Sequence, residues 1–215
     1  MREYTLEILT FLMFGMVTFS AVFYNSLNLV QKLMLAYMFL FTLHEWEERR
    51  FPGGFAKLML KFFKLKATPS QIEAAQIPVT ILLILITFVP FFYPYALLAL
   101  VPVYLGLFET FIHIIGIKLH KMEKPYTPGL ITALCLGLTS IIAILNFSRN
   151  NLVQNGDYLW GLLLMFICFG AMQRTVISIY GLGYKDLIAN FKNKINRWII
   201  TTITILLINV FKFSV

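Results

Sequence analysis

The sequence predicts an all-α protein, a polytopic bundle of transmembrane helices. Hydrophobic residues make up 59% of the 215 residues, and charged residues only 13%. Apolar runs of membrane-spanning length recur along the whole chain. Lys and Arg fall mostly in the short segments between these runs, as is typical of membrane proteins. We therefore expect one integral membrane domain over residues 1–215.

The apolar runs predict about seven spans, with about six possible because the last run is slightly short. A polar turn too short for anything but a hairpin separates the first two runs, and an aromatic turn around Pro94 separates the third and fourth. Ser70 with Glu73 forms a capping-box pattern before the third run, and Thr127 with Pro128 forms a helix-start pattern before the fifth. The predicted spans cover residues 5–24, 29–46, 76–93, 96–117, 128–147, 158–181 and 198–211.

A short amphipathic helix is predicted after the second span. Lys57, Lys61 and Lys64 recur at helical spacing opposite Phe, Leu and Met side chains. A basic face opposite an apolar face is typical of a helix that lies in the membrane interface.

The charge distribution predicts topology and lipid contact. The net charge of +8 comes from basic residues in the loops, so we expect contact with anionic membrane lipid and no nucleic-acid partner. Placing the N-terminus in the cytoplasm puts most of the 18 Lys and Arg residues on the cytoplasmic side. The sequence thus predicts a multi-pass protein of the cell membrane with a cytoplasmic N-terminus. Cys135 and Cys168 fall inside apolar runs, which favours free thiols.

The most unusual stretch is residues 44–50, which follows directly on an apolar run. It holds one His, three Glu and two Arg. On a helix, Glu47 and Glu48 lie three and four residues from His44, so both carboxylates flank the imidazole. The alternative is a solvated juxtamembrane cluster in which Glu and Arg neutralise each other.

A second cluster lies on the fourth predicted span. Glu109, His113 and His120 are spaced by four and seven residues, so they project from one helical face. The predicted topology puts this face at the same cytoplasmic depth as His44, and all 3 histidines of the chain then share one layer. A carboxylate inside a membrane is expensive unless it is paired, and by default it indicates function.

The histidines and glutamates of the two clusters together suit a divalent metal ion. His44, His113 and His120 with Glu47, Glu48 and Glu109 could hold Zn²⁺ with an open position, or one or two iron or manganese ions. Glu47 and Glu48 lie about 100° apart on a helix, so one of them is expected to reach the ligands while the other meets Arg49, Arg50 or a second metal. Glu47 or Glu109 would serve as ligand or general base. The alternative is a set of buried His–Glu and Arg–Glu pairs that fix helix packing.

Two further residues are candidates for substrate binding. Arg174 lies inside the sixth predicted span, where it would either neutralise Glu109 or hold the anionic head group of a lipid-like substrate. Tyr126, and at the same depth Tyr180, could donate hydrogen bonds to the site.

Two motifs give the chain a family resemblance. His44-Glu45-Trp46-Glu47-Glu48 fits the pattern His-x-x-Glu-Glu, and it is followed by Phe51-Pro52-Gly53-Gly54-Phe55; later come His113 and the run Tyr126-Thr127-Pro128-Gly129-Leu130 with Thr132-Ala133. The chain resembles the HXXEE-motif family of small integral membrane proteins over about residues 30–147. The resemblance implies roles for His44, Glu47, Glu48 and His113, and no particular reaction. Many relatives have Asn at the position of Glu109.

Three functions stay open at this point. The first is a membrane-embedded metalloenzyme acting on a lipid or another apolar substrate, hydrolytic with zinc and oxidative with iron. The set of 3 histidines is smaller than in membrane desaturases, which favours hydrolysis-type or isomerase-type chemistry. The second is a binding or transport protein with a cation or proton site. The third is a structural subunit that binds a partner within the membrane.

Overall fold

The computed structural model describes residues 4–120 and 122–181. Within these ranges every regular element is helical, which confirms the all-α prediction. The last predicted span, residues 198–211, lies outside the described residues. The elements are α1 (Thr5–Val22), the 3₁₀ turn η2 (Tyr24–Ser26), α2 (Leu29–Arg49), α3 (Phe55–Phe63), α4 (Pro69–Phe92), α5 (Ala96–Leu119), α6 (Leu130–Arg149) and α7 (Asn155–Ile179).

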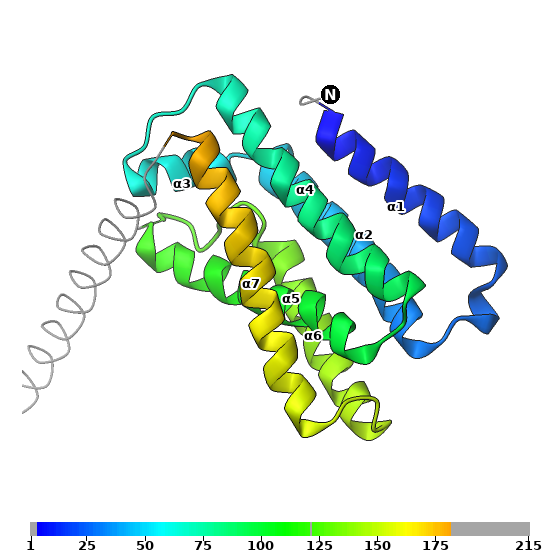
Figure 1. Cartoon of the computed structure of the whole chain (residues 1–215). Helices are drawn as coiled ribbons and strands as arrows, with labels where there is room; N and C mark the ends of the chain where they lie inside the picture. The colour runs from blue at the N-terminus through cyan, green and yellow to red at the C-terminus, as the bar shows by residue number, and fades with distance from the viewer. Residues whose placement is uncertain (1–3, 121, 182–215) are drawn as a thin grey trace, which may run out of the picture.

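The long helices form two groups, and α2 and α4 of the first group contact the second (Figure 1). One group holds α1, α2 and α4, which run side by side. In the other group α5 packs extensively against both α6 and α7. Helix α2 also contacts α6, and α4 also contacts α7, so the two groups form one bundle. The C-terminal end of α2 thus lies where α3, α5 and α6 can reach it.

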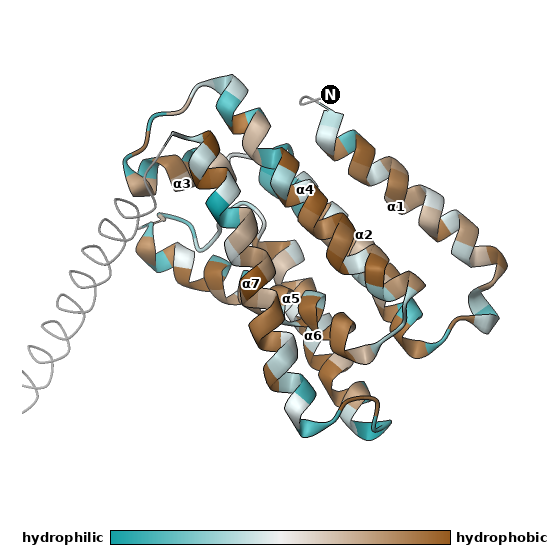
Figure 2. Ribbon diagram, in the orientation of Figure 1, coloured by the Kyte–Doolittle hydropathy of each residue, from teal (hydrophilic) through white to brown (hydrophobic). Residues whose placement is uncertain are grey.

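Hydropathy along the helices is compatible with a membrane protein, with apolar residues in the helix bodies and polar residues near their ends (Figure 2). Among the described residues, 5 helices are long and apolar enough to cross a membrane: α1, α4, α5, α6 and α7. Helix α2 matches the predicted span at 29–46 in position but is more polar than these. Gln31 and Lys32 in its first turn and the charged cluster at its end account for the difference.

Two helix starts differ from their predictions. Helix α4 is capped by Thr68, whose hydroxyl accepts from the Gln71 backbone N–H, so the predicted Ser70–Glu73 box is wrong. Pro69 then occupies the first helical position, where its missing N–H costs nothing. Helix α6 begins at Leu130 after Gly129, and not at Pro128 after Thr127. The Thr127 side chain is used elsewhere, in the site described below.

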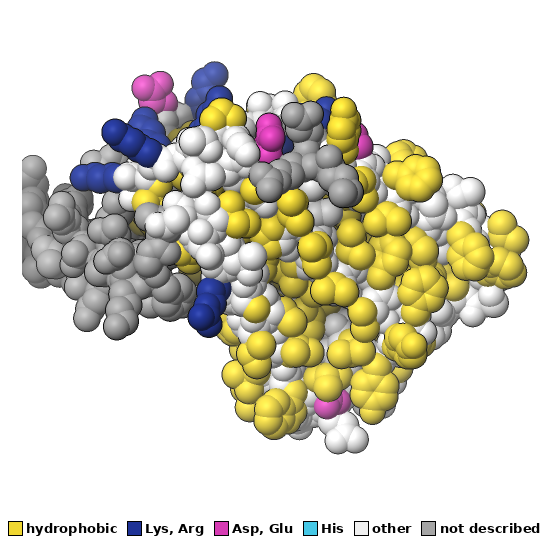
Figure 3. Space-filling model, turned by 45° about the horizontal axis from the view of Figure 1, so that its top comes forward, with side chains coloured by type: hydrophobic (Ala, Val, Ile, Leu, Met, Phe, Trp, Pro, Cys, Tyr) yellow, Lys and Arg dark blue, Asp and Glu magenta, His cyan; other side chains and the backbone are white. Residues whose placement is uncertain are grey.

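Helix α3 is short and amphipathic, as predicted. It follows Gly54, and none of its residues is fully buried. Lys57 and Lys61 are exposed, while the intervening apolar side chains are half-buried. Most of the Lys and Arg side chains visible in Figure 3 gather at its upper left, whereas hydrophobic side chains cover most of the remaining described surface. This contrast is typical of a protein whose middle faces lipid.

Close helix packing holds the α5–α6 pair in register. A Cβ atom on Gly137 would lie 2.4 Å from the Thr110 hydroxyl oxygen, so only glycine permits this approach. Thr110 uses that approach to donate a hydrogen bond to the Ala133 carbonyl at 2.5 Å. Small residues and interhelical hydrogen bonds of this kind are the usual means by which helices associate in lipid.

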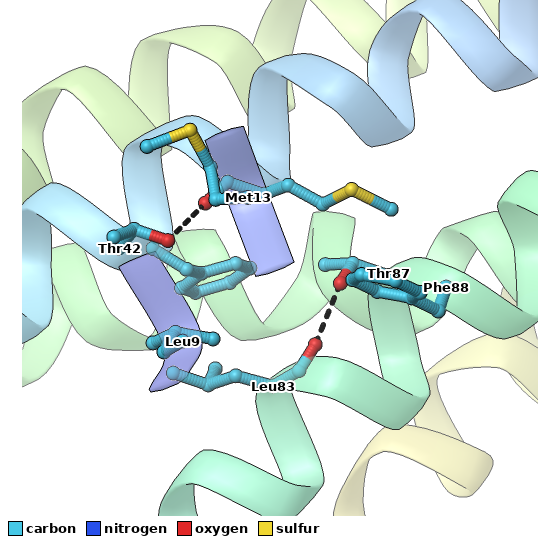
Figure 4. Close-up of a pocket in the computed structure, with 8 residues that line it drawn as sticks. Leu9, Met13, Thr42, Leu83, Thr87 and Phe88 are labelled. Carbon is cyan, nitrogen blue, oxygen red and sulfur yellow. Dashed lines mark hydrogen bonds between the residues drawn. The ribbon is translucent and has the colours of Figure 1, made fainter. Parts of the chain in front are cut away.

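An apolar crevice lies between α1, α2 and α4, away from the histidines. Leu9 and Met13 of α1 and Leu83 of α4 line it, together with Thr42 and Thr87 (Figure 4). Both threonine hydroxyls donate to carbonyls of their own helices, Thr42 to Met38 and Thr87 to Leu83. Both hydroxyl protons are thus used within the helices, and the other lining side chains are apolar.

Candidate metal centre

Two helices bring four chemically reactive side chains to one point. Helix α2 supplies His44 and Glu48, and α5 supplies Glu109 and His113, each pair four residues apart on its own helix. Glu48 Oε1 lies 3.5 Å from His44 Nε2 and 3.2 Å from His113 Nε2. Glu109 Oε2 lies 3.8 Å and 3.9 Å from the same two nitrogens. The two imidazole nitrogens and two carboxylates therefore surround one small volume.

These separations suit a tetrahedral metal ion. Donor atoms of His44, Glu48 and His113 all lie within 4.8 Å of one another. Ligands bonded to Zn²⁺ at about 2.0–2.1 Å in a tetrahedron are about 3.3 Å apart. The observed distances from Glu48 to the two histidines bracket that value, so small side-chain shifts would complete the coordination. Glu109 is slightly farther from both nitrogens and stands at the position of a fourth ligand or a nearby base.

A threonine orients each histidine. The Thr132 hydroxyl donates to Glu47 at 2.6 Å, so its oxygen accepts from His44 Nδ1 at 3.0 Å. The Thr127 hydroxyl faces the His113 backbone carbonyl at 3.4 Å, and its oxygen lies 3.0 Å from His113 Nδ1. Each imidazole then carries its proton on Nδ1 and presents a lone pair at Nε2. Ligating histidines are usually oriented by such a partner on the second nitrogen.

The Nε2 atoms of His44 and His113 both face carboxylates, and this arrangement requires positive charge between them, supplied either by a proton on one imidazole or by a cation. Within the described residues, the buried His113 Nε2 has no hydrogen-bond partner. The two rings are perpendicular and only 5.1 Å apart between centroids, so two imidazolium charges here would repel each other. A single divalent cation shared by neutral imidazoles and carboxylates satisfies all of these groups together.

Gly129 makes room for the cluster. It lies in the left-handed region with φ +98°, and a Cβ atom on it would lie 2.6 Å from His113 Cε1, 2.8 Å from Glu48 Cγ and 2.9 Å from His44 Cε1. The backbone just before α6 is therefore pressed against three of the four side chains. Any larger residue would displace them, and only glycine adopts this conformation without strain.

Glu47 faces α6 instead of the histidines. Its Oε1 accepts from the Tyr126 hydroxyl at 2.8 Å and from the Ile131 N–H at 3.1 Å. Its Oε2 accepts from the Thr132 N–H at 2.8 Å and from the Thr132 hydroxyl at 2.6 Å. The carboxylate thus caps the N-terminus of α6, where unpaired N–H groups and the helix dipole favour negative charge. Burial and the bond to Glu47 raise the pKa of the Tyr126 hydroxyl to about 12.

The opposite side of the α2 end is held by a second set of polar contacts. Glu45 is buried and forms an ion pair with Arg49. The Arg49 guanidinium also donates to Thr5 of α1 at 3.1 Å and to Thr80 of α4 at 3.3 Å. The last two turns of α2 are thereby fixed to α1 and α4 on one side and to α6 on the other. Such anchoring limits how far His44 and Glu48 can move.

Helix α3 closes one side of the centre. The Phe55 ring lies 5.1 Å from the His113 ring, centroid to centroid, at 33°. Phe55 follows directly on the Gly53–Gly54 turn, so this turn returns the chain over the end of α2. The aromatic ring covers the imidazole and limits the approach of water from this side.

Two predicted site residues lie apart from this group. His120 follows the last residue of α5, and its ring contacts Phe62 of α3 at 4.8 Å between centroids. Although it shares a face with His113, seven residues of helix separate them by about 10 Å along the axis, and His120 is not among the residues whose donor atoms lie within 4.8 Å of one another. Arg174 is exposed on α7 and forms no salt bridge within the described residues, so it neutralises neither Glu48 nor Glu109 there.

The remaining predicted residues take places that sequence spacing alone did not specify. Of the two adjacent carboxylates, Glu48 reaches the histidines, while Glu47 binds the start of α6 and neither Arg49 nor Arg50. Tyr126 reaches Glu47, not the histidines. Spacing gave Thr127 only the role of a helix start and gave Gly129 and Thr132 none, although all three lie in the second run quoted for the resemblance. The sequence did offer one signal for these three residues. They belong to the run Tyr126–Ala133, which accompanies the distant His-x-x-Glu-Glu motif in the resemblance.

Comparison with known proteins gives a family. The family model described as "Protein of unknown function with HXXEE motif" matches residues 35–144, which is more than half of the chain. The matched region holds His44, Glu47, Glu48, Glu109 and His113 with the loop that orients them. No curated protein and no solved structure matches the chain significantly. The chain thus belongs to the HXXEE-motif family, and the residues of this motif, His44 to Glu48, lie at the centre.

Proposed function

We propose that this protein is a membrane-embedded, metal-dependent enzyme that acts on a lipid or another apolar substrate. His44, Glu48 and His113 hold a divalent cation, Zn²⁺ in the version we favour, and Glu109 is a fourth ligand or the general base. The centre lies at the cytoplasmic side of the cell membrane, with the N-terminus in the cytoplasm. The observation that carries the proposal is the convergence of the His44 and His113 Nε2 atoms on the Glu48 carboxylate, with a threonine hydroxyl at Nδ1 of each imidazole.

The histidines and carboxylates of the centre indicate which reaction it would support. A bound Zn²⁺ supplies Lewis acidity and lowers the pKa of water, which suits hydrolysis. His44 and His113 are buried, whereas the side chains of Glu48 and Glu109 keep exposures of 14% and 20%. The carboxylates therefore form the accessible side of the centre, and a substrate would approach there. Glu109 is close enough to both histidines to hold or accept a proton beside the cation.

The metal content of the purified protein tests the centre. We expect about one equivalent of divalent metal in the detergent-purified wild type by mass spectrometric elemental analysis. The His44→Gln/His113→Gln double variant should lose it, because glutamine offers no comparable nitrogen lone pair. His120→Gln is the matched control, since His120 lies outside the group and should leave the metal content unchanged.

The outcomes distinguish the possible roles. Zinc lost only in the double variant supports hydrolysis-type chemistry, and iron or manganese lost in the same way redirects the search to oxidation. Wild-type metal content in the double variant contradicts the centre. Metal-free wild type that still folds would assign the His–Glu layer to helix packing or to proton binding, and the enzymatic proposal would fall.

Turnover tests the role of Glu109. We expect Glu109→Gln to retain its metal, because three other ligands remain, and to convert substrate about 100-fold more slowly or worse, as is typical for the loss of a general base. The measurement is product formation from an extract of membrane lipids, followed by mass spectrometry with and without a chelator. Equal product formation by wild type and Glu109→Gln would exclude Glu109 as the base.

A further inference from the structure

A second candidate site lies between α3 and the loop that follows α5. A cavity of about 570 Å³ opens there, lined by Lys61 and Phe62 of α3 and by His120, Lys124 and Tyr126 of the loop, among others. It is large enough for the head group of a lipid or a comparable small molecule. Its lining residues are separate from His44, Glu48 and His113.

The lining combines positive charge with apolar walls. Lys61 of α3 and Lys124 of the loop are exposed and line the cavity together with one glutamate, Glu123. Phe62 and Leu119 supply half-buried apolar surface beside them. A ligand that fits must carry negative charge at one end and tolerate hydrocarbon at the other. Phosphate attached to an acyl glycerol has this combination.

The position of the cavity agrees with that chemistry. It lies at the end of α5, which is one of the helices apolar enough to cross a membrane, and beside the amphipathic α3. Head groups of the bilayer occupy this level. We propose that the cavity binds the phosphate group of an anionic lipid, with Lys61 and Lys124 contacting the phosphate and the acyl chains leaving along α3.

Hydrogen bonds connect the cavity with the histidines. Tyr126 lines the cavity and donates to Glu47 at 2.8 Å; Thr132 donates to the same carboxylate, and its oxygen lies 3.0 Å from His44 Nδ1. A lipid bound at Lys61 and Lys124 would therefore be connected through Tyr126 and Glu47 to Thr132, which orients His44. This inference deepens the proposed function and rests on it for the claim that the lipid is a substrate; lipid binding itself does not require the metal.

Binding of defined lipids to the full-length, detergent-purified protein tests the proposal. Native mass spectrometry would follow phosphatidylglycerol, with phosphatidylcholine as the zwitterionic comparison and inorganic phosphate as the soluble one. We expect Lys61→Gln/Lys124→Gln to bind phosphatidylglycerol about 30-fold more weakly, since each Lys near an anionic lipid contributes about fivefold. Lys57→Gln/Lys64→Gln removes the same charge from lysines outside the cavity lining, and should bind almost as the wild type does.

Each outcome has a fixed meaning. If both double variants bind phosphatidylglycerol equally weakly, the cavity is not the binding site, and the lysines act by general attraction between α3 and anionic lipid. Equal affinity for phosphatidylcholine, or displacement by inorganic phosphate, would overturn the anionic-lipid assignment. Two results separate this proposal from the previous one. Lipid binding retained by a metal-free His44→Gln/His113→Gln variant supports the cavity independently of the metal. A metal-containing wild type that binds no phosphatidylglycerol overturns the cavity alone.

Discussion

Gly129→Ala is expected to disrupt the candidate metal centre and destabilise the bundle together. The new methyl group would lie within 2.9 Å of carbons of His113, Glu48 and His44, which are fixed by their own helices. Overpacking of this kind costs about 1–3 kcal/mol, and the left-handed backbone adds about 1–3 kcal/mol for a residue with a Cβ atom. We expect a lower thermal midpoint in detergent and loss of bound metal by elemental analysis.

Gly54→Ala is the matched control for backbone strain. Gly54 has φ +100°, almost the value of Gly129, but a Cβ atom on it would meet nothing within 4 Å. Gly54→Ala therefore introduces the strain of a left-handed backbone without the close contacts that a methyl group on residue 129 would make. If both variants lose stability equally and both keep the metal, the close approach of Gly129 to the centre is unimportant, and the proposed geometry is wrong.

Glu47→Gln should show that this residue positions the centre without binding the ion. The amide would leave two of the four donors on Tyr126, Ile131 and Thr132 facing an NH₂ group. Each donor without its acceptor costs about 1–3 kcal/mol, so we expect a loss of about 2–6 kcal/mol in the free energy of unfolding. Because Thr132 also orients His44, metal affinity should fall about 10- to 100-fold. Chelator competition and thermal denaturation measure the two effects.

The comparison for Glu47→Gln is Glu73→Gln, the same change in the first turns of α4. It should leave both stability and metal affinity near wild type. If Glu47→Gln instead abolishes metal binding with unchanged stability, Glu47 is a ligand after all, and the hydrogen bonds to α6 rearrange when the ion binds.

Sequence spacing predicted the helical elements and the central pairs of the site. Helical geometry places residues four apart side by side, so His44 with Glu48 and Glu109 with His113 could be paired from the sequence. Placing both pairs at one depth required only the order of apolar runs and the distribution of Lys and Arg. These inferences depend on helical periodicity and on the positions of apolar and basic residues along the chain, and both can be read from the sequence.

The other roles depend on how helices turn relative to each other, which spacing does not contain. Glu47 and Glu48 are equivalent in sequence, and only the position of α6 decides which one meets the histidines. Thr127 resembles a helix cap, yet the fold turns it toward His113. His120 shares a face with His113, but two turns of rise remove it from the group. Facing direction alone therefore predicted a larger converging group than the described residues form.

The bonds between Glu47 and the start of α6 also bear on the order in which the molecule assembles. Glu47 and Thr132 lie 85 residues apart, so α2, α3, α4 and α5 are synthesised before the loop that orients both histidines. A chain arrested before residue 127 would contain all four candidate ligands without the threonines and the glycine backbone that arrange them. Domains generally form from the N-terminus during synthesis, and the centre is therefore completed late. On the proposed function, capture of an ion would then accompany the docking of α6, before α7 packs against α4 and α5.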